Sequence, residues 1–140
     1  MATEFVLDRF VVAQNRIYGD VCAELAAGEK SSHWMWFVFP QLQGLGRSTM
    51  AIKYGIESNE EARAYWQHPV LGARLKACVA LVVGVRAKTA FQIFGTPDDL
   101  KFWSSMTLFG RVVPEEPSFK LALVQYFDGR DDAKTVELLK

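Results

Sequence analysis

The sequence lacks an excess of charge of either sign, since sixteen basic and sixteen acidic residues give a formal net charge of +0. Without a net positive charge to attract phosphate backbones or anionic lipid, we expect neither nucleic acid nor a membrane as a partner. No apolar run reaches the roughly 18 residues that cross a bilayer. The first residues also lack a basic stretch followed by an apolar core, so we expect no signal peptide. Together these absences predict a cytoplasmic protein.

Cysteine is scarce as well. Both cysteines, Cys22 and Cys78, fall within apolar patterns of helical period. Neither has a second Cys or a His at the spacing that metal sites use. We therefore expect two buried, reduced thiols, no metal site and no cofactor.

Apolar bulk is abundant: 50% of the 140 residues are hydrophobic, which suits a single domain with a large core. The bulkiest stretch, residues 31–41, includes Trp34, Trp36, Phe37 and Phe39. On a helix Trp34 and Trp36 would lie about 200° apart, so such a helix would be buried on every side. We predict a short central helix here, capped by Ser31 or Ser32 and ended by Pro40. A buried β-strand is the alternative, but the helical pattern of the flanking segments favours a helix.

Apolar spacing and capping residues predict helices along the rest of the chain. Ser58-Asn59-Glu60-Glu61 is a capping box, and Thr96-Pro97-Asp98-Asp99 has a cap, a proline at the first helical position and acids in the first turn. The expected helix starts are Asp8, Arg16, Ser48 or Thr49, Ser58, Pro69, Thr89, Thr96, Ser118 and Asp131 or Asp132. The prediction is an all-α single domain, residues 1–140, with eight or nine mostly short helices around the central aromatic helix.

Two polar clusters are candidates for chemistry. His33 lies in the predicted first turn of the central helix beside Lys30, where free N–H groups and the helix dipole favour an anion. Asp98, Lys101, Ser104 and Ser105 fall within an arc of roughly 120° on the helix beginning at Thr96, and with Thr107 they would line a polar cleft. The alternatives are a capping histidine packed on tryptophan and a solvated Asp98–Lys101 ion pair.

Residues 44–49 form a third candidate. Its two glycines allow close approach of a ligand to the backbone, Arg47 offers a bidentate fork for phosphate, and Ser48 and Thr49 open a helix. The motif matches neither the Walker nor the dinucleotide fingerprint, and a tight loop with an ordinary cap is the alternative. His68, before Pro69, most simply caps a helix or fills a turn.

Three runs together resemble one known family: Ser-His-Trp-Met-Trp-Phe-Val-Phe-Pro-Gln-Leu at 32–42, His-Pro-Val-Leu-Gly at 68–72, and Ile-Phe-Gly-Thr-Pro-Asp-Asp-Leu-Lys at 93–101 with Ser-Ser-Met-Thr-Leu-Phe at 104–109. It is a family of small bacterial proteins, an all-α domain of unknown function that is sometimes labelled calpastatin. The resemblance implies an all-helical domain and brings no established activity. The calpain inhibitor of that name is a disordered polar chain, unlike this apolar one.

The functional hypothesis is a small enzyme or binding domain for a phosphate-bearing metabolite of the nucleotide or ADP-ribose type. We expect His33 and Asp98 to supply acid–base groups in one shared cleft, with Arg47 at its mouth. The expected ligand-binding residues are Trp34, Trp36, Gln41, Arg47, Ser48, Lys53, Lys101, Ser104, Ser105 and Thr107. A noncatalytic interaction module with an aromatic surface is the alternative, and tryptophans that only fill the core are a third reading. We favour a monomer, although the sequence leaves the oligomeric state open. The sequence leaves open whether any reaction is catalysed.

Overall fold

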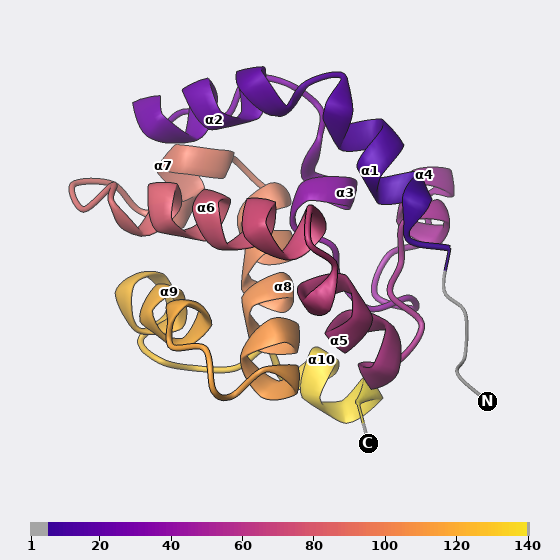
Figure 1. Cartoon of the computed structure of the whole chain (residues 1–140). Helices are drawn as coiled ribbons and strands as arrows, with labels where there is room; N and C mark the ends of the chain where they lie inside the picture. Colours follow the sequence, from indigo (N-terminus) through magenta and orange to yellow (C-terminus); the bar gives the residue numbers. More distant parts are fainter. Residues whose placement is uncertain (1–5, 140) are drawn as a thin grey trace.

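The longest helix, α8 (Asp98–Val112), runs through the middle of the molecule in a computed structural model that describes residues 6–139 (Figure 1). It packs against α3, α5, α7, α9 and α10. Every residue from Ser104 to Gly110 is buried. The chain is therefore assembled around α8, and the aromatic segment is one of several elements that pack on it.

Ten helices, one or two more than expected, follow one another in the described part of the chain. They are α1 (Asp8–Asn15), α2 (Tyr18–Ala27), α3 (Met35–Val38), α4 (Thr49–Lys53), α5 (Asn59–Gln67), α6 (Leu71–Val83), α7 (Ala90–Phe94), α8, α9 (Ser118–Phe127) and α10 (Ala133–Leu138). The only extended pairing within residues 6–139 is an isolated bridge between Leu42 and Ile56. The all-α prediction is confirmed. Among the described helices none is long and apolar enough to cross a membrane.

Several helix starts follow the local sequence as predicted. The Ser58 hydroxyl accepts a hydrogen bond from the Glu61 backbone N–H at 3.1 Å, and Ser48 does the same for Ala51 at 3.1 Å. Thr89 and Gln92 form a reciprocal capping box at the start of α7. Because a cap needs only residues within one helical turn, these contacts can be predicted from sequence.

Two other starts differ from the prediction. Pro97, not Thr96, occupies the N-cap position of α8, and no side chain caps this helix, so the predicted cap by Thr96 is wrong. The helix itself extends well past Ser105, as expected. Pro69 lies in a turn rather than at the first position of α6, and the His68 ring nitrogen Nδ1 accepts from the Val70 N–H at 3.1 Å. His68 therefore organises the turn into α6, which confirms the simpler of its two readings.

Gly72 explains why this turn is so tight. A Cβ at Gly72 would lie 1.9 Å from the carbonyl oxygen of Trp66, so no other residue fits while α5 and α6 keep this close approach. The His-Pro-Val-Leu-Gly run at 68–72 thus joins two helices and has a structural role.

The aromatic segment is buried but is helical over only four residues, Met35–Val38. Trp34 occupies the N-cap position and offers no side-chain cap, so the predicted role of Ser31 or Ser32 as N-cap is wrong. Trp34 and Phe39 are 0% and 1% exposed, whereas Trp36 is half-buried. The expectation of burial on every side therefore holds for Trp34 and not for Trp36.

Candidate functional site

Glu24, on α2, holds the segment that leads into α3. One of its carboxylate oxygens accepts hydrogen bonds from the backbone N–H groups of Ser31 and Ser32 at 2.7 and 2.9 Å and from the Trp34 indole N–H at 3.0 Å. The other oxygen accepts from the Ser32 hydroxyl at 2.6 Å. Burial favours the neutral acid, but these four donors outweigh it and lower the pKa of Glu24 to about 2. The serines thus bind a distant carboxylate and are not free to cap α3.

Asp98, at the start of α8, lies between two lysines. Its carboxylate is 2.8 Å from Lys30 Nζ and 3.6 Å from Lys101 Nζ. Lys30 Nζ lies 5.0 Å from the ring centroid of Trp34, and Lys101 Nζ lies 5.0 Å from that of Trp36. The side chain of Lys30 is only 6% exposed. We call these five residues the lysine–tryptophan cluster.

The lysine–tryptophan cluster leaves little room for a ligand. Trp36, Gln41 and Lys101 line a space of about 10 Å³, which is close to the volume that one water needs. Trp34 is fully buried and donates its indole N–H to Glu24. The expectation that Trp34 binds a ligand is therefore wrong, because its ring has no exposed surface. Among the predicted site residues, Lys101 contacts both Asp98 and Trp36, and Gln41 lines the same small space as Trp36 and Lys101.

The hydroxyl run of α8 has structural partners. Ser104 Oγ donates to the Asp132 carboxylate at 2.6 Å, and Thr107 Oγ1 accepts from the Asp132 backbone N–H at 2.9 Å. Asp132 also accepts from Thr135 Oγ1 at 2.7 Å and caps α10. Ser105 is fully buried, and its hydroxyl has no hydrogen-bond partner among the described residues. Ser104 and Thr107 thus fasten α10 to α8, and the polar cleft expected along this arc is not formed by them.

His33 does not line the same space as the residues of the lysine–tryptophan cluster. It is exposed, it precedes α3 by two residues, and the predicted place in a first helical turn is therefore wrong. Its side chain lines a hollow of about 580 Å³ between α1, α3 and α4, whose lining does not include Asp98. The structure therefore does not bring His33 and Asp98 into one shared cleft.

We call this second place the basic hollow. Its wall carries the basic side chains of Arg9, Arg16 and Lys53 together with His33, and one carboxylate, Asp8. Its apolar lining consists of Val6, Val12, Ala13, Ile17, Phe37 and Tyr54. Positive charge therefore exceeds negative charge around a largely apolar floor.

The basic side chains of the hollow differ in whether they already have hydrogen-bond or ion-pair partners. Arg9 is engaged, since its guanidinium donates to the carbonyls of Lys53 at 2.8 Å and Gly55 at 3.2 Å and pairs with Glu61 at 3.4 Å. Arg16 and Lys53 are exposed and form no ion pair with another residue in 6–139. The Lys53 ammonium lies 5.2 Å from the ring centroid of Tyr54. Arg16 and Lys53 are therefore the cations available to a ligand.

The Gly44–Thr49 loop does not join either place. Arg47 is exposed and does not line the basic hollow, so the expectation that it guards the mouth of the site is not supported. Ser48 caps α4, which is the structural alternative for this loop. Because α4 has only five residues, its N-terminus offers a weaker dipole than a long helix would.

Arg16 is the candidate site residue that could not be singled out from the sequence. Arg9, Val12, Ala13 and Arg16 have the spacing i, i+3, i+4, i+7, which places them on one face of α1. That spacing can be read from the sequence, but no local pattern indicates that this face of α1 lies near His33 and Lys53.

Within residues 6–139 no group of three His, Cys, Asp or Glu side chains could hold a metal ion.

Comparison with known proteins gives a family but no activity. The sequence profile of a family described as "Protein of unknown function (DUF1810)" matches residues 4–139. The chain belongs to this family. It is also similar to the conserved hypothetical protein Rv1873 from Mycobacterium tuberculosis, which has a crystal structure at 1.38 Å. The two sequences are 53% identical, the match covers 96% of each chain, and the TM-score is 0.95. No curated protein matches the chain. The resemblance read from the three sequence runs is thus confirmed.

Proposed function

We propose that this protein binds a phosphate-bearing metabolite in the basic hollow. The observation that carries the proposal is the pair of unengaged cations, Arg16 and Lys53, beside His33 on the wall of a hollow of about 580 Å³. Small-molecule sites usually enclose about 300–1,000 Å³ and combine an apolar lining with a few polar groups. The basic hollow has that size and that composition.

Each polar group has a distinct part in the proposal. The Arg16 guanidinium offers two parallel N–H donors to a phosphate, and the Lys53 ammonium adds a point charge. His33 supplies a ring N–H donor, or a proton acceptor if the bound metabolite reacts. Val12, which is 50% exposed, and Ile17 offer apolar surface for the rest of the metabolite. A cytosolic location is the setting in which we propose that this binding occurs.

A thermal-shift experiment tests the proposal. Pyrophosphate, ADP and ADP-ribose are the probes, with adenosine and ribose as phosphate-free counterparts. We expect Tm to rise with at least one phosphate-bearing probe and with neither counterpart, because a ligand at 100 times its Kd adds about 2.7 kcal/mol. The rise should shrink as salt is added, since exposed charges are screened over about 10 Å at 0.1 M ionic strength.

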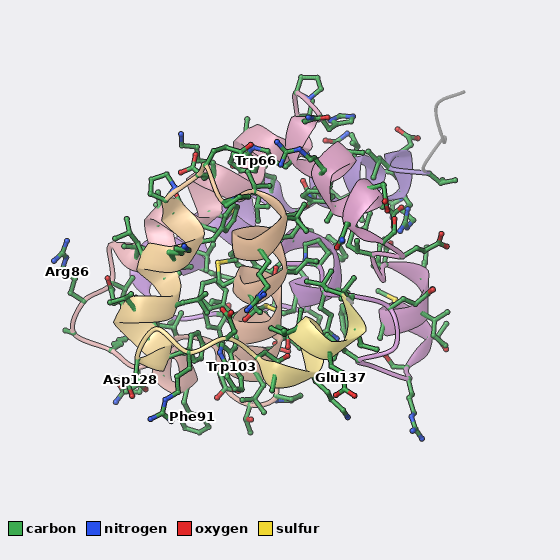
Figure 2. The ribbon with its side chains drawn as sticks, turned by 90° about the horizontal axis from the view of Figure 1, so that it is seen from below. Trp66, Arg86, Phe91, Trp103, Asp128 and Glu137 are labelled. Carbon is green, nitrogen blue, oxygen red and sulfur yellow. The ribbon has the colours of Figure 1, made fainter. Side chains whose placement is uncertain are left out.

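Matched variants locate the binding. In the double variant R16A/K53A the Kd of the active probe should rise at least tenfold, a loss of about 1.4 kcal/mol. The control R86A/K134A removes the same two charge types from exposed residues that do not line the hollow. Arg86 is exposed in the loop after α6 and projects from the opposite edge of the molecule (Figure 2). The proposal would be refuted if the probe raised Tm equally in the two double variants, or if no phosphate-bearing probe raised the Tm of wild type.

The alternative of an interaction module would need a surface other than the aromatic segment, because Trp34, Phe37 and Phe39 are buried. Phe91 is an exposed aromatic residue, 59% exposed, and Figure 2 shows it near Trp103 at one edge of the view from below. Trp103 itself is held by a hydrogen bond from its indole N–H to the Arg130 carbonyl at 2.8 Å and stacks on Phe127. These observations favour the basic hollow over an aromatic docking surface.

A further inference from the structure

The two cysteines face each other across neighbouring helices. Figure 1 shows α2 and α6 side by side and running in the same direction, and the two helices pack together. Tyr18 and Cys22 are four residues apart on α2, and Arg74 and Cys78 are four residues apart on α6. The Arg74 guanidinium lies 4.7 Å from the ring centroid of Tyr18. Because the two helices run in the same direction, the residues one turn further along each helix, Cys22 and Cys78, should also lie next to each other.

The surroundings of Cys78 and Tyr18 agree with this register. Burial first, and the nearby Cys22 next, raise the pKa of the Cys78 thiol to about 12. Burial and then Cys22 also raise the pKa of Tyr18. Cys22 therefore lies within interaction distance of both groups. It is half-buried, whereas Cys78 is buried, so a dissolved reagent reaches Cys22 first.

We propose that Cys22 and Cys78 are a modification site, at which a peroxide converts the two thiols into a reversible disulfide between α2 and α6. The sequence does not show this pairing, because 55 residues separate the two cysteines and their spacing matches no motif. The site is separate from the basic hollow and does not depend on the function proposed there.

The chemistry balances with hydrogen peroxide as the oxidant. The Cys22 thiol loses its proton, and the thiolate attacks one peroxide oxygen, which breaks the O–O bond and forms the sulfenic acid. The released hydroxide takes up the proton that the thiol lost and leaves as one water. The Cys78 sulfur then attacks the Cys22 sulfur, the S–S bond forms, and the S–O bond breaks. The hydroxyl leaves with the proton of Cys78 as a second water. The two sulfurs together lose two electrons, and the peroxide gains them.

Intact-mass measurement tests the site. The folded protein is treated with hydrogen peroxide, denatured, and alkylated with N-ethylmaleimide. Untreated protein should take up two alkyl groups. Oxidised protein should take up none, weigh two hydrogens less and remain a monomer on a non-reducing gel. Dithiothreitol should restore both alkylation sites, and the oxidised protein should have a higher Tm because the cross-link restricts its unfolded state.

Single variants distinguish a pair from two independent thiols. C78S should retain an oxidisable Cys22 that proceeds to the sulfinic acid, while C22S should keep its buried Cys78 alkylatable after the same treatment. Protein oxidised in denaturant, where the helices no longer set the register, should close the monomeric disulfide at least tenfold more slowly. Two alkylatable thiols remaining in oxidised wild type, a sulfinic Cys22 beside an intact Cys78 thiol, or disulfide only between chains would each overturn the proposal.

Discussion

At the scale of single residues, Glu24 fixes the path of the aromatic segment into the core. Its carboxylate collects the N–H groups that precede α3 and the indole N–H of buried Trp34. A buried indole donor without a partner would cost about 1–3 kcal/mol. Glu24 removes that cost, and in doing so it sets where α3 begins.

Replacing Glu24 with glutamine should lower the free energy of unfolding at neutral pH by about 1–3 kcal/mol, because the four donors lose a charged acceptor. The pKa of Glu24 in the folded protein, about 2, is below its ordinary value of 4.5. Its contribution to stability is therefore present above about pH 4.5 and is lost as the pH falls toward 2. Urea unfolding at about pH 7 and about pH 3 measures this effect. The free energy of unfolding should fall between the two pH values in wild type, and it should fall less in E24Q.

Glu29 provides the matched control for this prediction, because it is an exposed glutamate in the segment that joins α2 to α3. E29Q should keep both the neutral-pH stability and the pH dependence of wild type. An E24Q variant with the pH dependence of wild type would contradict the assignment of the low pKa to Glu24.

The two tryptophans of the segment should respond differently to truncation. Trp34→Ala removes a fully buried ring and leaves a large cavity, so it should cost about 3–5 kcal/mol. Trp36→Ala removes a half-buried ring and should cost less, about 1–3 kcal/mol. Denaturant midpoints measured on both variants check the order. A Trp36→Ala cost equal to that of Trp34→Ala would show that the burial of the two rings is misassigned.

At the scale of elements, the ends of helices separate what sequence can predict from what it cannot. Ser58, Thr89 and Asp132 cap their helices through residues within one turn, and each was expected. Ser32 has the same local signature, yet its hydroxyl binds Glu24, eight residues earlier, so the expected start of α3 was wrong. A cap is a local interaction, but a competing acceptor from a neighbouring helix is not visible in a local pattern.

The junction between α8 and α10 gives the prediction for this scale. Asp132 caps α10 and accepts from the hydroxyls of Ser104 and Thr135, so D132A should lower the free energy of unfolding by about 2–3 kcal/mol. Asp131, its neighbour, pairs with Arg111 at 2.9 Å near the surface, and D131A should cost no more than about 1 kcal/mol. Chemical unfolding of both variants measures the difference. Equal costs would mean that the junction contributes nothing beyond a surface ion pair.

At the scale of the whole molecule, the fold class follows from the apolar period, but the grouping of polar residues does not. The sequence placed Trp36, Gln41, Asp98 and Lys101 in one site, and the structure does bring them together. It brings them together as ion pairs and cation–π contacts with almost no free volume. His33 and Lys53, assigned to the same site, instead meet Arg16 in the basic hollow. Which helix faces meet depends on tertiary packing, which periodicity alone does not specify.

The structure thus separates a closed polar cluster from an open one. In the lysine–tryptophan cluster both lysines pair with Asp98, and each ammonium also lies over a tryptophan ring, so neither lysine is without a partner. In the basic hollow Arg16 and Lys53 remain unpaired among the described residues and face a volume suited to a small molecule. Membership of a family without an established activity leaves this contrast as the main guide to function.

The measurement that tests this account most directly is an NMR titration of the ¹⁵N-labelled protein with the phosphate-bearing probe that gives the largest Tm shift. The account predicts that amide shift changes concentrate on residues 12–17, 33–37 and 53–54, and that they disappear in R16A/K53A but persist in R86A/K134A. Shift changes centred on Lys30, Asp98 and Lys101, with residues 12–17 unaffected, would contradict it.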